Sequence, residues 1–456
     1  MRISPRRTTI ALVAALAACA AVPAAGHASA GQSLVFEAPT QLLYDQTRPG
    51  TLDEIQRFGV TDLRQLVYWQ SFAPKPNARH KPKFDAADSN AYPAGTWDRL
   101  DHLVADAQAR GLKLQLTLTG PVPKWATAKR SDHLTRPSAT EFGRWVKAIG
   151  RRYGSRISTW SLWNEPNSNH FLKPTGLGAA GVYRKLYIAG AKALRSTRSN
   201  RHDRILLGET APRGNRNTSH PLAFLRRMLC LNGSYRRTSR CARLDTQGYA
   251  HHAYTTRTGP HFKPPTDDVT IGVLSRLTSA LDRAARARTL PRHLRLYLTE
   301  FGIQTYPDKV SGVPQAKQPA YLAISEHIAY TNSRVAQFSQ YLLNDDKSSG
   351  GFQTGLKTYQ GKKKPAYAAF PIPLAVESYG RRDVLWGLVR AYRRTTHVVV
   401  QSRVGRKGAW KTLRRVTTST KGVYSFSTRH RKGISYRVRW TPPTGGRLTG
   451  PPIGAN

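Results

Sequence analysis

Cysteine is scarce in this chain. Only three of the 456 residues are cysteines, and one of them, Cys19, lies in an apolar N-terminal stretch. The other two, Cys230 and Cys241, flank a polar loop rich in arginine. An even pair of cysteines in an exported protein usually forms a disulfide, so we expect a bond that staples a surface loop. Two free thiols are the alternative, and zinc is disfavoured because neither cysteine has a second ligand at zinc-finger spacing.

Long hydrophobic runs are also missing. The apolar stretch from Ile10 to Val22 is shorter than the roughly 20 residues that a membrane span needs. It follows several arginines and precedes Ala28-Ser29-Ala30, a small-x-small cleavage pattern. We therefore predict a signal peptide over residues 1–30, a secreted protein and no transmembrane span. The alternative is a lipid-anchored envelope protein, because Leu16-Ala17-Ala18-Cys19 has the pattern expected before a lipid-modified cysteine.

Acidic residues are few. The chain has 72 Lys and Arg against 26 Asp and Glu, a formal net charge of +46, and no acid follows Asp383. Such a charge attracts nucleic acid, an acidic envelope or an acidic polysaccharide. Export argues against nucleic acid, so we expect the basic C-terminal region to bind an acidic polysaccharide or an anionic cell envelope.

Two tetrapeptides carry the functional signal. They are Trp163-Asn164-Glu165-Pro166 and Thr299-Glu300-Phe301-Gly302, and each follows a short apolar run typical of a β-strand. Each therefore places a glutamate at the C-terminal end of a strand, where barrel enzymes keep their chemistry. A pair of carboxyl groups is what glycosidic cleavage requires, since one donates a proton and the other supplies negative charge.

These tetrapeptides resemble the strand-4 and strand-7 signatures of clan A glycoside hydrolases, which include the family 5 cellulase-like and family 39 xylosidase-like enzymes. The resemblance implies a (β/α)8 barrel, an acid/base at Glu165 and a nucleophile at Glu300. It implies a retaining hydrolase of O-glycosidic bonds that needs no cofactor or metal. A transglycosylase using the same two glutamates and a non-catalytic carbohydrate-binding protein remain as alternatives. We expect a monomer.

The resemblance extends to further residues around the expected site. Arg64, after the second strand, matches the clan's arginine that bonds the nucleophile; a solvated arginine is the alternative. His252 and Tyr254 resemble the clan's sixth-strand His-x-Tyr, with the tyrosine orienting Glu300 and the histidine near the sugar. Asn164 resembles the asparagine that bonds the sugar 2-hydroxyl, or else it forms the turn before Pro166.

Aromatic and histidine residues near these strands have two interpretations. Trp69 is a candidate substrate-binding residue that could stack on a sugar face, and the alternative is that it plugs the barrel mouth. Trp125 could stack on a sugar or pack in the core. His251 and His252 could suggest a metal, but neighbouring residues of a strand point to opposite faces. The sequence departs from the clan at the eighth strand, where a tryptophan is usual and Tyr341 stands here.

Strand and helix patterns alternate through the first part of the chain, as a parallel barrel demands. We predict the barrel over residues 31–380, with strands at residues 33–36, 62–67, 112–119, 157–162, 205–208, 248–254, 294–298 and 335–342. Beyond it the period becomes two, with short strands between glycine-containing turns. This pattern predicts a small β-sandwich of immunoglobulin or fibronectin type over residues 381–441, followed by a flexible tail over 442–456 that is rich in proline and glycine.

Overall fold

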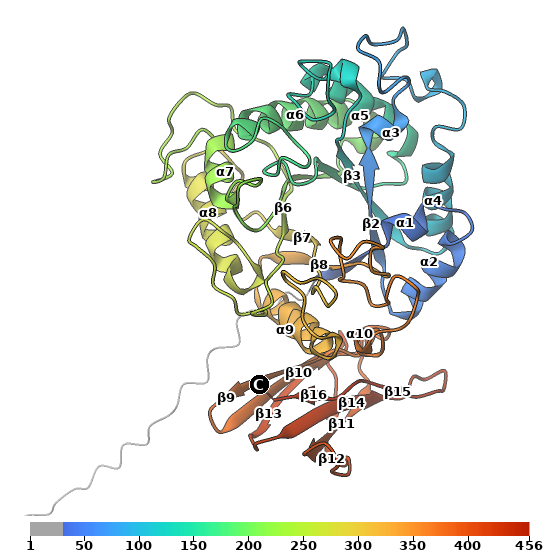
Figure 1. The fold of residues 1–456 in the computed structure, drawn as a ribbon, viewed down its shortest axis with the longest axis vertical. Helices are drawn as coiled ribbons and strands as arrows, with labels where there is room; N and C mark the ends of the chain where they lie inside the picture. The colour runs from blue at the N-terminus through green and yellow to red at the C-terminus, as the bar shows by residue number, and fades with distance from the viewer. Residues whose placement is uncertain (1–30, 456) are drawn as a thin grey trace, which may run out of the picture.

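The computed structural model describes residues 31–455, and its larger part is a closed barrel of eight parallel strands. The strands pair in chain order, and the eighth closes the barrel against the first. Helices surround the barrel, as Figure 1 shows. The predicted (β/α)8 fold is confirmed. The signal peptide expected over residues 1–30, including Cys19, lies outside the described residues.

The barrel strands are close to those expected from the apolar runs. They are β1 (Ser33–Glu37), β2 (Asp62–Tyr68), β3 (Lys113–Thr119), β4 (Thr159–Leu162), β5 (Arg204–Thr210), β6 (Gly248–His252), β7 (Leu296–Glu300) and β8 (Val335–Tyr341).

The longer helices cover the barrel through one apolar face each. In α4, for example, Leu100, Leu103 and Val104 are buried, while Asp98 and Asp101 occupy the first turn, where negative charge suits the helix dipole. The α-helices of the structure are α1 (Pro39–Leu42), α2 (Arg48–Arg57), α3 (Trp69–Phe72), α4 (Asp98–Ala109), α5 (Ala139–Tyr153), α6 (Gly178–Arg195), α7 (Pro221–Met228), α8 (Leu274–Arg286), α9 (Gln318–Thr331) and α10 (Pro365–Ala369).

The C-terminal part is a sandwich of two antiparallel sheets. One sheet has the order β13-β10-β9, and the other has the order β12-β11-β14-β15, with β16 also paired to β14. The strands are β9 (Leu374–Tyr379), β10 (Arg382–Leu388), β11 (His397–Val404), β12 (Lys411–Thr417), β13 (Val423–Arg429), β14 (Ile434–Trp440), β15 (Leu448–Thr449) and β16 (Ile453–Gly454). An all-β C-terminal unit is therefore confirmed.

The limits of this sandwich differ from the expected ones. Its first strand, β9, begins at Leu374 and pairs along β10, so residue 381 falls in the turn between these two strands. The segment lacks a period of two because Val376 packs into the sandwich core while Ala375 packs against α9. Within the segment 442–456, which we expected to be a flexible tail, strands β15 and β16 pair with β14.

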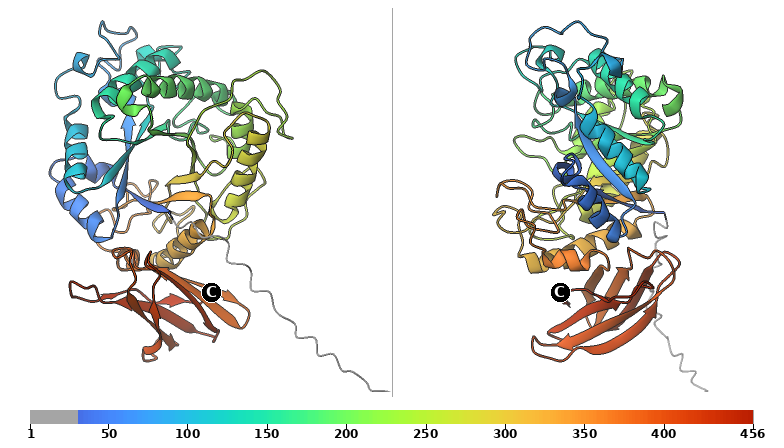
Figure 2. Two further views of the ribbon diagram at one scale, coloured as in Figure 1. Left: turned by 180° about the vertical axis from the view of Figure 1, so that it is seen from behind. Right: turned by 90° about the vertical axis from the view of Figure 1, so that its right-hand side faces the viewer.

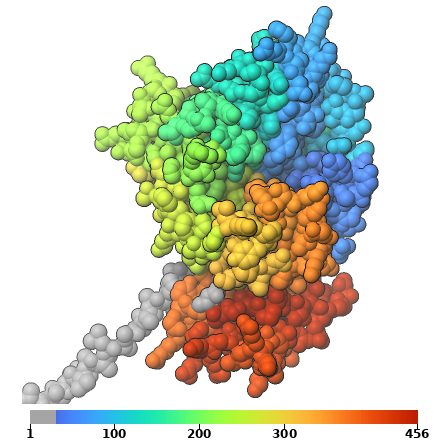
Figure 3. Space-filling view, in the orientation of Figure 1, coloured from blue at the N-terminus to red at the C-terminus, as the bar shows by residue number. Residues whose placement is uncertain are grey.

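The sandwich rests on the barrel through α9. Ala323 and Ile324 of α9 pack against Ala375, Trp386 and Leu388 of the β9–β10 hairpin. Figures 2 and 3 show the sandwich as a lobe at one side of the barrel. The sheet β13-β10-β9 thus lies between the barrel and the second sheet.

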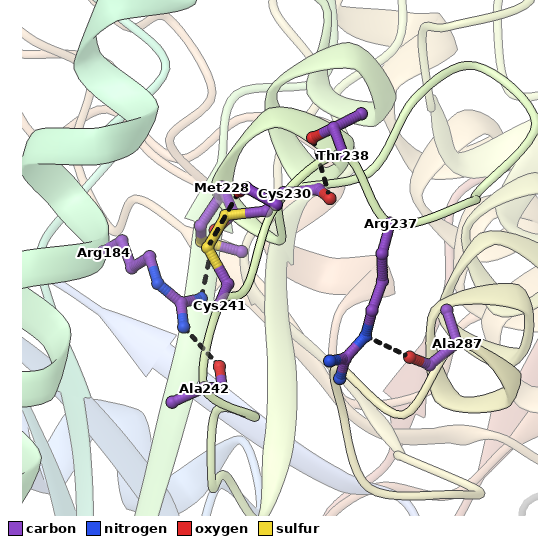
Figure 4. The surroundings of a disulfide bond; sticks show 9 residues. Arg184, Met228, Cys230, Arg237, Thr238, Cys241, Ala242 and Ala287 are labelled. Atoms are coloured by element: carbon purple, nitrogen blue, oxygen red, sulfur yellow. Dashed lines mark hydrogen bonds between the residues drawn. A yellow bond between two sulfur atoms is a disulfide. The ribbon is translucent and has the colours of Figure 1, made fainter.

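The expected disulfide joins Cys230 to Cys241, whose Cα atoms lie 6.2 Å apart. Arginines brace the loop from both sides (Figure 4): Arg184 donates to the carbonyl of Met228 at 3.2 Å, and Arg237 donates to that of Ala287 at 2.9 Å. The bond closes a loop beyond α7 and lies outside the barrel. Between residues 31 and 455, no helix is long and apolar enough to cross a membrane.

Candidate active site

The two motif glutamates converge on one histidine. His252, the last residue of β6, places Nδ1 2.9 Å from Oε1 of Glu165 and 3.7 Å from Oε2 of Glu300. These two oxygens can therefore be no further apart than the sum of the two distances. The side chain of Glu165 is 20% exposed and that of Glu300 is 7% exposed, so Glu165 is the more accessible of the pair.

The backbone around Glu165 is strained. Trp163 has φ 85° and Glu165 has φ 39°, a region that residues other than glycine seldom adopt. The indole of Trp163 is buried and donates to the carbonyl of Phe171 at 3.2 Å, while the N–H of Glu165 donates to the carbonyl of Glu209 at 2.9 Å. These bonds hold the chain in the conformation that turns the carboxyl group of Glu165 toward His252.

Glu300 is oriented by two donors. The hydroxyl of Tyr254 donates to its Oε1 at 2.8 Å, and Arg64 Nη1 lies 3.3 Å from its Oε2. Burial and the neighbouring charge of Glu300 raise the pKa of Tyr254 well above its ordinary value, so this tyrosine keeps its proton and remains a donor. The structure brings together all three residues that the sequence associates with the nucleophile position.

Arg64 is the centre of a larger buried cluster. Its guanidinium donates to Glu37 Oε2 at 2.5 Å and to Glu209 Oε2 at 2.7 Å, and both carboxylates are fully buried. Thr117 links Arg64 and Glu209, because its hydroxyl accepts from Arg64 Nε and donates to Glu209 Oε1, each at 3.0 Å. Burial lowers the pKa of Arg64, but the three surrounding carboxylates outweigh it and raise that pKa well above its ordinary value.

Sequence reasoning missed Glu37 and Glu209. Each stands directly after a predicted strand, which is the same signal that identified Glu165 and Glu300, but neither belongs to a recognised motif. Glu209 also depends on an irregularity of β5. The register against β6 shifts between Gly208 and Thr210, and Glu209 has φ 49°, which turns its side chain inward to Arg64.

Glu37 is a carboxyl group whose negative charge is costly in this cluster. Burial raises its pKa well above the ordinary value; Arg64 opposes this shift, while Glu300 and Glu209 add to it. Its Oε1 is buried and has no hydrogen-bond partner among residues 31–455. Glu37 therefore keeps its proton to higher pH than an ordinary glutamate.

The two adjacent histidines of β6 have separate roles. His251 points away from the site, accepts from Thr210 at Nδ1 and donates to the carbonyl of Val269, and burial lowers its pKa to about 4. Burial also lowers the pKa of His252, but Glu300 and Glu165 outweigh it, so the pKa of His252 is raised. In the described part of the chain, no group of three or more His, Cys, Asp or Glu side chains is placed to hold a metal ion.

Solved structures of two glycoside-cleaving enzymes are similar to this chain. One is a family 39 glycoside hydrolase from the gut symbiont Bacteroides cellulosilyticus WH2, with a TM-score of 0.52, 15% identity, and coverage of 90% of this chain and 81% of that chain. Another is the exo-β-1,4-mannosidase Op5Man5 from Opitutaceae bacterium strain TAV5, with a TM-score of 0.49, 15% identity, and coverage of 74% and 58%. This chain shares the (β/α)8 barrel fold with the family 39 enzyme.

Sequence comparison adds nothing to this likeness. No family model matches the chain, and no curated protein matches it by sequence. At 15% identity the shared architecture establishes the fold alone. What this barrel does must therefore be argued from its own side chains.

Asn164 lies beside the two glutamates. Its Oδ1 accepts from Arg64 Nη2 at 2.8 Å, and its backbone N–H donates to the hydroxyl of Thr119 at 3.1 Å. Because the oxygen of the amide is bound to Arg64, the orientation of the amide is fixed and its nitrogen is the group that remains to donate to a ligand hydroxyl.

Trp69 does not belong to this group, which corrects the expectation that it binds substrate. It begins α3, is 1% exposed, and stacks on Trp145 of α5 with ring centroids 5.5 Å apart. Trp125 meets it edge to face at 5.9 Å and is buried as well. Both tryptophans form a packing cluster between the barrel and α5, so neither presents a free face to a sugar.

Tyr341 is the last residue of β8. Its ring meets Phe352 edge to face at 4.8 Å, and Phe352 also lies 5.6 Å from the ring of Tyr254. Burial raises the pKa of Tyr341 well above its ordinary value, and the charges of Glu300 and Glu37 add to this shift. The phenol of Tyr341 therefore keeps its proton and lies close enough to Glu300 to be influenced by its charge.

Proposed function

We propose that the protein is a retaining glycoside hydrolase that cleaves O-glycosidic bonds by double displacement. The observation that carries this proposal is the convergence of Glu165 and Glu300 on His252, with Arg64 and Tyr254 bound to only one of the two. Acetal cleavage requires one carboxyl group that donates a proton and another that attacks as a nucleophile. Glu165 and Glu300 can divide these roles because they lie close together but have different partners.

The spacing of the two carboxyl groups supports retention. Retaining enzymes place them about 5–5.5 Å apart, whereas inverting enzymes need about 6.5–9.5 Å to admit a water molecule. Because Glu165 Oε1 and Glu300 Oε2 lie 2.9 and 3.7 Å from the same nitrogen of His252, their greatest possible separation is close to the lower limit of the inverting range. Direct attack by a carboxylate fits this separation better than attack through water.

In the first step, Glu300 attacks the anomeric carbon while Glu165 donates its proton to the leaving oxygen, so the glycosidic bond breaks as the glycosyl-enzyme ester forms. Tyr254 and Arg64 hold Glu300 in position, and Asn164 offers its amide nitrogen to the sugar 2-hydroxyl. In the second step, Glu165 takes a proton from water, whose oxygen attacks the anomeric carbon and releases Glu300.

We also propose that the substrate is an oligosaccharide or polysaccharide outside the cytoplasm. The disulfide between Cys230 and Cys241 supports an oxidising compartment. The expected signal peptide is consistent with this location.

Substitution of Glu165 by alanine tests the acid role. A panel of 4-nitrophenyl glycosides first identifies the sugar that the unaltered protein accepts. With that sugar, we expect Glu165→Ala to keep a nearly normal kcat/KM for an activated dinitrophenyl glycoside, with a burst of dinitrophenol before slow hydrolysis of the glycosyl-enzyme. For a phenyl glycoside with a poor leaving group, we expect kcat/KM to fall about 10²–10⁴-fold. Equal losses on both substrates would refute the role of Glu165, and no turnover of any glycoside by the unaltered protein would favour a binding protein.

A further inference from the structure

The sheet of the sandwich that lies away from the barrel gathers arginines on its outer face. In β11, Val398 and Val400 point into the sandwich core, so Val399, Gln401 and Arg403 point outward. Residues opposite one another in neighbouring strands share a face. Val399 lies opposite Arg415 of β12 and Arg439 of β14, and Gln401 lies opposite Arg437. We call Arg403, Arg415, Arg437 and Arg439 the arginine face.

These four charges have no acidic counterpart. No Asp or Glu follows Asp383 in the chain, and Asp383 itself is buried within the sandwich, where it accepts from Tyr436 at 2.6 Å. Within residues 31–455, no salt bridge involves any member of the arginine face. Partial burial lowers the pKa of Arg437, and the nearby charges of Arg439 and Arg403 lower it further. The face is therefore a cluster of like charges that an anion would stabilise.

Part of the arginine face is held in place before any ligand arrives. The guanidinium carbons of Arg403 and Arg437 lie 4.6 and 4.3 Å from the ring centroid of Trp410. Arg437 Nε also donates to Gln401 Oε1 at 2.8 Å. Arg403 Nε is buried and has no hydrogen-bond partner in the described structure. Such fixed arginines lose little conformational entropy when they bind.

The arginine face is also free of the barrel. The opposite sheet, β13-β10-β9, carries the residues that pack on α9, and the inner faces of the two sheets bury one another. In Figure 1, β11 and β12 lie on the side of the sandwich that is turned away from the barrel. A long polymer can therefore reach this surface while the barrel remains open.

We propose that the arginine face binds a polysaccharide that carries carboxylate groups. The planar fork of a guanidinium matches a carboxylate with two parallel hydrogen bonds, and the face repeats this group on three adjacent strands. A polyuronate repeats carboxylates along its length and so can engage several arginines at once. A carbohydrate partner suits a sandwich attached to a barrel of the glycoside hydrolase fold. Binding at the arginine face is separate from turnover in the barrel. The binding proposal can therefore be wrong while the proposed enzymatic function is right, and the enzymatic proposal can be wrong while the binding proposal is right.

The test measures binding of polygalacturonate to the full mature chain. Its fully methyl-esterified form, which has the same sugars without the charges, is the matched ligand. The main variant replaces Arg403, Arg437 and Arg439 by glutamine. The control variant replaces Arg198, Arg286 and Arg292, three exposed arginines of the barrel, and so removes the same net charge. A third variant, Trp410→Ala, keeps the charge but frees two guanidinium groups.

We expect the main variant to lose about tenfold or more in affinity, and the control to lose less than about twofold. Trp410→Ala should lose about threefold in affinity for polygalacturonate. The methyl ester should not bind, and affinity for polygalacturonate should fall as salt rises from about 0.05 to 0.5 M. Equal losses of affinity in the main and control variants would show that net charge alone explains the binding, and would overturn the proposal. The proposal would also be overturned if single-stranded DNA bound as tightly as polygalacturonate through the same arginines, because the face would then bind any polyanion.

Discussion

At the scale of single residues, the site is defined by a surplus of carboxyl groups. Glu37, Glu209 and Glu300 surround the one guanidinium of Arg64, and Glu165 faces His252. Burying this many negative charges together is costly in a medium of low dielectric constant. The raised pKa of Glu37 is the physical response, because a neutral carboxyl group relieves the repulsion around Arg64.

Glu37→Gln tests that interpretation through its pH dependence. A folded-state pKa above the unfolded value of 4.5 means that Glu37 contributes its full stability below about pH 4.5, and loses it as the pH rises through the folded-state value. Glutamine resembles the protonated form at all pH values. We therefore expect the free energy of unfolding of Glu37→Gln to lie within about 1 kcal/mol of that of the unaltered protein near pH 4.5. As the pH rises, the variant should become more stable relative to the unaltered protein.

Urea unfolding between pH 4.5 and 9 makes this comparison. Glu141→Gln, which removes a partly exposed carboxylate paired with Lys81, is the control for loss of a charge at the surface. A relative stability of Glu37→Gln that falls as the pH rises would show that Glu37 is ionised and stabilising in the folded protein.

At the scale of elements, the side chains for which we propose catalytic roles stand where strands end. The apolar runs predicted all eight barrel strands, and the motifs placed Glu165 and Glu300 at the ends of β4 and β7. Glu209 also follows a predicted strand, but it belongs to no recognised motif, and its inward direction depends on a bulge between Gly208 and Thr210 that only pairing with β6 reveals. Trp69 was misassigned because its position after a strand resembles that of a ligand-binding residue, whereas its contacts come from α5, far along the chain.

The glycine at position 302 of the strand-7 motif is required for a steric reason. A Cβ atom at this position would lie 2.3 Å from the carbonyl oxygen of Tyr341 and 2.6 Å from Cβ of Thr354. The end of β7 would have to move away from β8, and Glu300 would move with it.

We expect Gly302→Ala to lower the free energy of unfolding by about 1–3 kcal/mol. We also expect it to lower kcat/KM by about 10²-fold, since small displacements of a reacting group have large effects. Gly50→Ala is the control, because nothing lies within 4 Å of a Cβ there. Thermal unfolding and turnover of the best aryl glycoside measure both effects. Full activity of Gly302→Ala would show that the contact does not position Glu300.

At the scale of the whole molecule, the barrel and the sandwich share a buried ion pair. Arg390, just beyond β10, donates from Nη1 and Nη2 to the two oxygens of Glu326 in α9, each at 2.8 Å. Its Nε donates to the carbonyl of Phe370 at 2.8 Å, and its guanidinium stacks on that ring. Composition and periodicity could predict two units, but not this contact, because its partners come from an ordinary helix and a loop.

Loss of this ion pair should uncouple the two units. Arg390→Ala leaves the carboxylate of Glu326 buried without a counterion, and we expect a loss of about 3–5 kcal/mol in the free energy of unfolding. Arg394→Ala, at an exposed arginine four residues further on, should change it by less than about 0.5 kcal/mol. Calorimetry should show one transition for the unaltered protein and an earlier transition of the sandwich for Arg390→Ala. Equal stability of the two variants would show that the interface depends on α9 packing alone.

Rescue of a nucleophile variant by azide tests most directly whether Glu165 and Glu300 act as a pair on one acetal. Glu300→Ala should lose turnover, and added azide should restore it with a glycosyl azide of the anomeric configuration opposite to that of the substrate, because azide enters from the face that Glu300 vacates. Glu165→Ala with azide should give the same configuration as the substrate. A Glu300→Ala protein that keeps its activity, or that yields a product of unchanged configuration, would contradict the assignment.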